Sequence, residues 1–428
     1  MSNDIGRTDS RADIGRIART AIGCVLVLVP LSAGLAGCVG GGSLTGSPYD
    51  ATEELSFGTQ GGVQGGGKTV DPDEPLRITA SGDGDSRITD VVATDADGRT
   101  LPGELTADGR GWSSTGPLAP DSSYTVRVST ENDDGDQGRG EHAFRTGPSD
   151  ARELGVTLGP EPGEYGVGQP LTAALDRKIS DPAQRALVES ALLVSSEPAV
   201  VGSWYWVDDQ TVHYRPKEYW PADASITVQA DLTGLPLGEE LRGTRAEPLE
   251  ITTGDRIEAV ADITALTMTV SRNGEELRTM PMTTGKEGFR TRDGKKVVLG
   301  QASNVRMTGT SIGIPAGSAE SYDLNVEWAT QLTWSGEYVH GAPWSLASHG
   351  IANVSHGCTG LSTENALWFY DLVGPGDIVE HVNGFGEDMP AFGNGFGDWN
   401  LSWEEWQQGS ALSAVADETQ QGHLSPTI

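Results

Sequence analysis

The chain has 428 residues, with 29 Lys and Arg against 61 Asp and Glu, 58 Gly and three Cys. Because domains mostly run ~100–200 residues, this length accommodates about two to four of them. The net charge of −32 argues against nucleic-acid partners, since such proteins need clustered Lys and Arg to displace counterions. The Gly share is roughly twice the usual ~7% and favours turn-rich β structure over long helices. Three cysteines are too few for a disulfide-stapled scaffold.

The first 37 residues have the pattern of a secretory signal, in which basic residues precede an apolar run. The run over residues 21–37 follows four arginines, Arg7, Arg11, Arg16 and Arg19. Pro30 interrupts the run, which lacks the ~20 strongly apolar residues of a membrane-spanning helix. It ends in Leu35-Ala36-Gly37-Cys38, which resembles a bacterial lipobox. The resemblance implies that Cys38 is acylated and becomes the first residue of the mature protein; an ordinary signal peptide with a chance cysteine is the alternative.

Residues 38–70 are predicted to form a flexible tether. The tract contains GGGSLTGSP and GTQGGVQGGGK, which offer too few apolar side chains to build a core. A lipid followed by a tether would place the folded part outside the membrane, facing the cell wall. We therefore expect an exported monomer that is lipid-anchored to the outer face of the cell membrane.

Two β modules are predicted over residues 71–148 and 149–254. Short alternating segments such as LRITA, SYTVRVST and SITVQADL are separated by turn clusters, which is typical of β-sandwiches. One helix is expected over residues 181–190. Trp204 and Trp206 alternate along a strand and are expected in a core rather than at a ligand. His142 and His213 are isolated in the sequence and have no metal-ligand spacing around them.

The residues suited to chemistry are concentrated between 255 and 384. An alternating hairpin is predicted to turn at Asn273-Gly274, a preferred two-residue hairpin turn. Further along, His340, His349 and His356 surround Cys358. A lone cysteine in an exported protein is either an idle buried thiol or a reactive one. The neighbours of Cys358 are small and polar, and a nearby histidine would lower the thiol pKa, which favours the reactive interpretation. A zinc site is the alternative, but the spacing fits no common four-ligand pattern.

The spacing of these residues resembles a known family. His340, fourteen further residues and then Ser355-His356-Gly357-Cys358 are similar to the signature of L,D-transpeptidases with a YkuD-type catalytic domain. The order of lipobox, tether, β modules and this segment resembles the actinobacterial members. The resemblance implies a mainly β protein: two immunoglobulin-like β-sandwich domains, then a β-rich catalytic domain over residues 255–384, then a short helical and loop subdomain over 385–412.

The resemblance also implies roles for the signature residues. Cys358 would be the nucleophile and His340 the general base and acid, with the backbone carbonyl of Gly341 fixing the imidazole tautomer. His356 would orient the loop and the substrate, although a purely structural role is equally open. The backbone N–H groups of Gly357 and Cys358 are candidates for the oxyanion hole.

The reaction implied by the family is transfer of a peptidoglycan stem. Cys358 would attack the bond between the diamino acid and the terminal D-Ala of a donor tetrapeptide, release D-Ala, and pass the acyl group to the side-chain amine of an acceptor stem, giving a 3→3 cross-link. No cofactor and no metal are implied. Two alternatives stay open: a cysteine L,D-carboxypeptidase, in which water replaces the amine, and a non-catalytic wall-binding scaffold.

Residues 301–334 would form an active-site flap. By resemblance, Met307 and Tyr322 would line the donor pocket, with the Tyr322 hydroxyl near the developing oxyanion, and Trp344 would form a wall of the cleft. Ordinary packing is the alternative for these three residues.

Ser355 and Gly360 would also contact substrate. Gly360 departs from the family pattern, because many relatives carry at this place an asparagine whose amide contacts the substrate. Water or a neighbour such as Ser362 would replace that amide, or the donor preference would differ.

After the catalytic domain, Trp399, Trp403 and Trp406 are expected to pack on the main body, with carbohydrate stacking as the alternative. Residues 413–428 are expected to be disordered. The β modules lack clustered basic residues, which predicts that they act as spacers rather than as glycan-binding domains.

Overall fold

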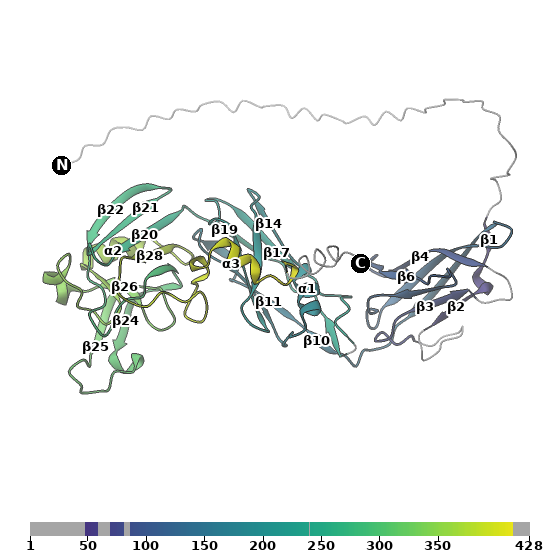
Figure 1. The fold of residues 1–428 in the computed structure, drawn as a ribbon, viewed down its shortest axis with the longest axis horizontal. Helices are drawn as coiled ribbons and strands as arrows, with labels where there is room; N and C mark the ends of the chain where they lie inside the picture. Colours follow the sequence, from purple (N-terminus) through teal and green to yellow (C-terminus); the bar gives the residue numbers. More distant parts are fainter. Residues whose placement is uncertain (1–47, 59–68, 81–85, 239, 414–428) are drawn as a thin grey trace, which may run out of the picture. The chain divides into compact units, whose positions relative to one another are not determined.

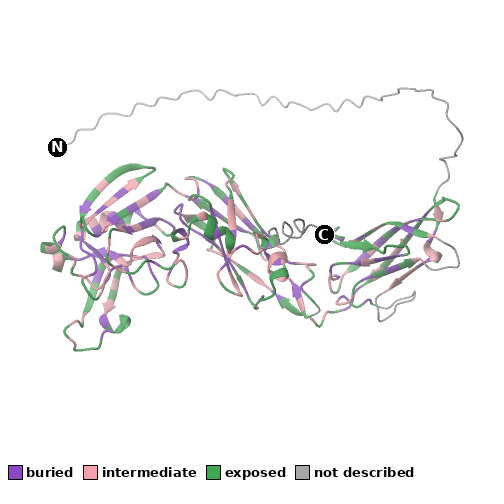
Figure 2. Ribbon diagram, viewed as in Figure 1, coloured by how far each residue is buried: buried purple, intermediate pink, exposed green. Residues whose placement is uncertain are grey.

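The computed structural model describes residues 48–58, 69–80, 86–238 and 240–413. The predicted signal, Cys38 and residues 414–428 of the predicted tail lie outside this part of the chain. Within it, no helix is long and apolar enough to cross a bilayer. The described residues form three β-rich bodies (Figure 1). Figure 2 shows buried residues concentrated in the interior of each body.

The first body is a sandwich of two sheets. In sheet order, one sheet contains β1 (Tyr49–Asp50), β9 (Gln137–Arg145), β8 (Ser123–Glu131), β4 (Arg87–Asp95) and β5 (Thr100–Leu101). The other contains β2 (Leu55–Gly58), β3 (Arg77–Ala80), β7 (Gly111–Ser114) and β6 (Gly103–Leu105). Side chains along β8 alternate between buried and exposed, so that one face of the strand contributes Tyr124, Val126 and Val128 to the core. Among the described residues this core contains no cysteine, so apolar packing and not a disulfide joins the two sheets.

The prediction of a tether up to residue 70 is wrong for residues 49–58. β1 pairs in parallel with β9, and β2 pairs with β3, with η1 (Thr52–Glu54) between them. Ala51 and Leu55 are buried in the core. These strands are two and four residues long, too short to show alternation beside Gly-rich sequence.

The second body is also a sandwich. One sheet contains β11 (Val156–Gly159), β13 (Leu171–Leu175), β16 (Thr211–Pro216) and β15 (Gly202–Trp206). The other contains β12 (Gly163–Tyr165), β19 (Leu249–Thr253), β17 (Ser225–Ala230) and β14 (Leu192–Glu197), and β10 (Arg152–Leu154) pairs separately with β18 (Leu241–Gly243). The expected helix is confirmed as α1 (Pro182–Ser190), where the Asp181 side chain accepts from the Gln184 N–H. Trp204 and Trp206 are buried in the core, as predicted.

The third body combines two sheets and a helix. One sheet contains β22 (Glu275–Pro281), β21 (Thr267–Arg272), β20 (Ile257–Asp262), β28 (Ile378–Val382) and β23 (Gly294–Val297). The other contains β24 (Gly300–Thr308), β25 (Asp323–Gln331), β26 (Tyr338–Gly341) and β27 (Thr359–Leu361). Residues of both sheets and of α2 (Thr363–Leu372) share one apolar core. The hairpin of β21 and β22 turns at Asn273 and Gly274, both with positive φ, which confirms the predicted turn.

The segment after β28 packs on the second sandwich through its tryptophans, as expected. It contains η4 (Asp398–Asn400) and α3 (Trp403–Gln408). The Trp406 indole is fully buried and donates to the Ser203 carbonyl at 2.9 Å. The buried Arg215 guanidinium lies over the rings of Trp399, Trp403 and Trp406.

The two histidines that look isolated in the sequence acquire partners in the fold. His213 Nδ1 lies 2.7 Å from a carboxylate oxygen of the buried Asp398, and the His142 ring stacks on Phe57. Both partners are far away in sequence, so these histidines serve packing and docking.

Candidate active site

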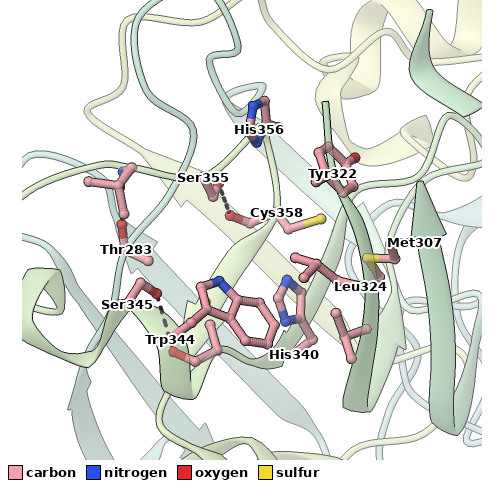
Figure 3. A pocket seen from close by; sticks show the side chains of 14 residues that line it. Thr283, Met307, Tyr322, Leu324, His340, Trp344, Ser345, Ser355, His356 and Cys358 are labelled. Atoms are coloured by element: carbon pink, nitrogen blue, oxygen red, sulfur yellow. Dashed lines mark hydrogen bonds between the residues drawn. The ribbon is translucent and has the colours of Figure 1, made fainter. Parts of the chain in front are cut away.

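A cavity of about 240 Å³ opens on the third body (Figure 3). It is lined by Thr283, Met307, Tyr322, Leu324, Val326, His340, Ala342, Trp344, Ser345, Val354, Ser355, His356, Cys358 and Gly360. The structure thus brings together eight of the ten residues singled out from the sequence. The other two, Gly341 and Gly357, are chain neighbours of His340 and Cys358 and shape the site through their backbone.

Strand pairing brings the histidine and the cysteine together. β26 and β27 are parallel, with Val339 opposite Thr359 and His340 opposite Gly360. Cys358 immediately precedes β27. Since successive side chains on a strand point to opposite faces, Cys358 and His340 project on the same side of the sheet. Figure 3 shows both side chains entering the cavity, with the Trp344 ring beside His340.

The His340 imidazole is held in one tautomer. Its Nδ1–H donates to the Gly341 carbonyl at 2.8 Å, so that Nε2 has the free lone pair. Burial lowers the pKa of His340, because the cation would lose its hydration. The ring is therefore neutral at pH 7 and can accept a proton at Nε2. The Gly341 side chain is not needed for this contact, since the acceptor is a backbone oxygen.

The Cys358 thiol is protonated in the resting protein. Burial raises its pKa to about 11, and the thiol donates to the Gly336 carbonyl at 3.5 Å. The expectation that a neighbouring histidine lowers this pKa is wrong for the resting state. The physical reason is that the buried His340 is neutral and supplies no positive charge to offset desolvation.

Gly357 allows the loop to present the thiol. Its φ of +122° lies in a region that side chains other than glycine rarely adopt. Its N–H donates to Ser355 Oγ at 3.1 Å, while Ser355 Oγ donates to the Cys358 carbonyl at 2.6 Å and Thr291 Oγ1 donates to the Gly357 carbonyl at 2.8 Å. The Gly357 N–H is therefore engaged, which contradicts its assignment to the oxyanion hole. The Cys358 N–H is the backbone donor left for that role.

His356 connects the loop that carries Cys358 to the predicted flap. Its Nε2 lies 2.9 Å from Glu320 Oε2, and its ring packs between Phe289 and Tyr322. Glu320 also pairs with Lys286, and these two contacts lower the pKa of its carboxyl. Sequence reasoning missed Glu320, Lys286 and Phe289. The only signal was that Glu320 is the single charged residue between 307 and 322.

The predicted flap is a hairpin. β24 and β25 pair in antiparallel register and are joined by residues 309–322, which include η2 (Gly309–Ile312). Met307, Tyr322 and Leu324 face the cavity, and Figure 3 shows the Cys358 sulfur pointing toward the side on which Tyr322 and Met307 lie. Trp334, at the end of the predicted flap, is exposed and does not line the cavity.

Gly360 sits where the cavity wall is already filled. A Cβ at this position would lie 3.0 Å from both the Thr283 Cγ2 and the Ala342 Cβ, tighter than ordinary contact. The neighbouring methyl groups thus occupy the space of a side chain. Ser362 does not replace the missing amide, because its hydroxyl caps α2 by accepting from the Asn365 N–H and it does not line the cavity.

The described residues contain no group of three or more His, Cys, Asp or Glu placed to hold a metal ion. The remaining histidine of the segment, His349, is buried and lies 3.1 Å from Ser345 Oγ through its Nε2. It supports η3 (Pro343–Ser348), the segment that carries Trp344.

Comparisons with known proteins identify the domains of this chain. Residues 256–380 match the model of the L,D-transpeptidase catalytic domain, and residues 67–236 match that of the bacterial Ig domain. The chain is 35% identical over 350 residues to L,D-transpeptidase 2 of Mycobacterium tuberculosis, which spans 82% of this chain and 84% of that protein. It is 40% identical over 217 residues to L,D-transpeptidase 1 of that species, or 51% of this chain and 80% of that one.

A solved structure of an L,D-transpeptidase in complex with imipenem is 38% identical in sequence, with a TM-score of 0.46 over 53% of this chain and 99% of that chain. Immunoglobulin-like sandwiches ahead of a domain that matches the L,D-transpeptidase catalytic model define an acyl-transferring enzyme. With the sequence identity to whole relatives, the chain belongs to the L,D-transpeptidase family and is an L,D-transpeptidase.

Proposed function

We propose that this enzyme forms 3→3 cross-links in peptidoglycan through a Cys358 thioester. The observation that carries the proposal is the hydrogen bond from His340 Nδ1 to the Gly341 carbonyl. It leaves the Nε2 lone pair as a base in the same cavity as the protonated thiol. A neutral thiol beside a neutral imidazole requires that the proton moves during attack, which is general base catalysis.

The first half-reaction consumes the donor stem. His340 Nε2 takes the thiol proton while Cys358 Sγ attacks the carbonyl that joins the diamino acid to the terminal D-Ala. The Cys358 N–H and the Tyr322 hydroxyl face the oxygen that becomes negative in the tetrahedral intermediate. The intermediate collapses when the imidazolium gives its proton to the departing amine. D-Ala leaves, and the stem stays on the sulfur as a thioester.

The second half-reaction regenerates the thiol. The side-chain amine of an acceptor stem attacks the thioester carbonyl, and His340 takes the amine proton. As the new amide forms, the sulfur departs and recovers a proton from His340. The product is an amide between two diamino acids. The apolar wall formed by Leu324, Val326 and Ala342 favours an amine over bulk water as acceptor.

The test is the intact mass of the protein after incubation with a tetrapeptide stem. We expect an increase equal to the tripeptide acyl group, with loss of D-Ala, and no increase in Cys358→Ala. Imipenem provides a second acylating agent, because its lactam carbonyl stands in for the scissile amide. Dimeric products show transfer, whereas shortened monomers alone would show an L,D-carboxypeptidase. Absence of any adduct would support a non-catalytic wall-binding scaffold instead.

We further propose that the enzyme works at the outer face of the membrane, anchored by lipid on Cys38. The support is the sequence pattern of residues 1–38. In producing cells, a labelled fatty acid should be incorporated into the wild-type protein and into Cys24→Ala but not into Cys38→Ala. Labelling of Cys38→Ala at the wild-type level would contradict the anchor.

A further inference from the structure

A cluster of buried charged groups lies behind the nucleophile. Lys296, on β23, is fully buried, and Glu337 and His381 around it are nearly so. Lysine is almost never fully buried unless it is paired. Charged clusters of this kind are costly to desolvate, and an apolar replacement of similar volume is often as stable. Stability of the fold therefore gives little reason for the cluster.

The hydrogen bonds of the cluster run from Lys296 through His381 to Thr359. Lys296 Nζ donates to the Arg292 carbonyl at 2.7 Å and lies 2.7 Å from Glu337 Oε2 and 3.3 Å from His381 Nδ1. An ammonium group only donates, so His381 Nδ1 accepts and the ring proton is on Nε2. That nitrogen lies 2.8 Å from the Thr359 hydroxyl and donates to it. Burial and the charge of Lys296 keep the pKa of His381 well below its ordinary value, which preserves this neutral tautomer.

Chain neighbours of the cluster contact the loop that carries Cys358. Glu337 pairs with the Arg292 guanidinium at 2.9 Å, and it follows Gly336, whose carbonyl accepts from the Cys358 thiol. Arg292 follows Thr291, whose hydroxyl donates to the Gly357 carbonyl. The cluster and its chain neighbours therefore contact residues 357, 358 and 359 in turn.

We propose that Lys296, Glu337 and His381 form a positioning network. The network fixes Thr359, at the end of the loop of residues 355–358, and so orients the Cys358 thiol into the cavity. This inference rests on the proposed cysteine mechanism and deepens it. None of the three side chains lines the cavity, so they act through Thr359 and the loop rather than on the substrate. Because the network lies in the interior, it sets the thiol position before any stem peptide binds.

The network also acts on the thiol through charge. Glu337 raises the pKa of Cys358 and Lys296 lowers it. The other titratable groups that share the cavity with the thiol or influence it are His340, His356, Tyr322 and Tyr338. Since the two network charges have opposite effects, removing them one at a time should move the ionisation of the thiol in opposite directions. Uncharged side chains at these positions would not produce this pattern, and the acylation rate reports the positioning of the loop.

The experiment uses alkylation of Cys358 by iodoacetamide as a function of pH, together with acylation by the tetrapeptide. Lys296→Met should shift the alkylation midpoint to higher pH and Glu337→Gln to lower pH, by about half a unit or more each. The double variant should return toward the wild-type midpoint. Lys296→Met should also slow acylation ~10–100-fold, the scale on which a misplaced reacting group is penalised.

Two further variants complete the design. Lys295→Met makes the same change one residue away, on a side chain that is not buried, and should match wild type in both assays. Thr359→Val removes the hydroxyl that His381 contacts and should slow acylation without moving the alkylation midpoint. If Lys296→Met does not fold, as judged by thermal melting, Glu337→Gln and Thr359→Val decide the question.

Unchanged midpoints together with wild-type acylation would overturn the proposal and reduce the cluster to packing. Alkylation needs no stem peptide, so the network can be judged even if the wild-type enzyme fails to acylate. Failure of the wild-type enzyme to acylate would refute the proposed function. The opposite shifts of the two charge variants would still test the network.

Discussion

The thiol of Cys358 should ionise only in strongly alkaline solution. With its pKa raised to about 11 by burial, about one molecule in 10,000 carries the thiolate at pH 7. Iodoacetamide reacts with the thiolate alone, so the alkylation rate should rise about tenfold for each pH unit between 6 and 10. A thiolate–imidazolium pair would behave differently, because its thiolate would already be fully formed near neutral pH.

The assay is the rate of carbamidomethylation by intact mass across this pH range, with Cys358→Ala as the background. A plateau between pH 6 and 8 would refute the reasoning, since it would show a thiolate stabilised by a charged His340. The complementary change is His340→Gln, which removes the base. It should slow acylation by the tetrapeptide ~10²–10⁴-fold while leaving alkylation at pH 10 unchanged.

The acid side of the activity profile follows from His340. Its pKa is lowered by burial, so the neutral base persists as pH falls through the ordinary histidine range near 6.5. Acylation by imipenem or tetrapeptide should therefore decline only below that range, where the imidazole finally takes up a proton. A decline centred above pH 7 would show that another group controls the reaction.

The remaining predictions concern the loop, the flap and the docked C-terminal segment. Gly357→Ala should lose about 1–3 kcal/mol of stability from its backbone conformation and most of its acylation rate, whereas Gly288→Ala, which is also at positive φ but does not adjoin Cys358, should lose only stability in thermal melts. Glu320→Gln should speed limited proteolysis of the flap modestly, since it weakens the pairing of Glu320 with Lys286 and His356, and an unchanged digestion rate would show that Glu320 does not hold the flap. Trp406→Ala should cost about 3–5 kcal/mol in the free energy of unfolding measured in urea, with normal acylation by the folded fraction; a loss below 1 kcal/mol would show that the segment is not docked in solution.

The meeting of His340 and Cys358 in one cavity could be predicted from the sequence because its signal is local. His340 and Cys358 stand at a characteristic spacing, and the Asn273-Gly274 turn and the α1 cap are likewise encoded within a few residues. The protonation of the thiol could not be predicted, because burial depends on the whole fold and outweighs the neighbouring histidine.

The network behind the thiol was missed for a related reason. Lys296, Glu337 and His381 are contributed by separate segments of the chain, and a lysine in GKKV gives no sign that it is buried. The pairing of Lys286 with Glu320 spans 34 residues and is invisible for the same reason. Long-range contacts between polar side chains leave no periodic pattern.

The parallel pairing of β26 with β27 has a consequence for how such enzymes diversify. The distance between His340 and Cys358 is fixed by sheet hydrogen bonds, so the crossover between the strands does not set it. That crossover carries the exposed Leu346 and Ile351. Residues there can be exchanged to suit a different acceptor while the reacting atoms stay in place. Selection of the acceptor and execution of the chemistry are thus separable, and the first can be engineered without retuning the second.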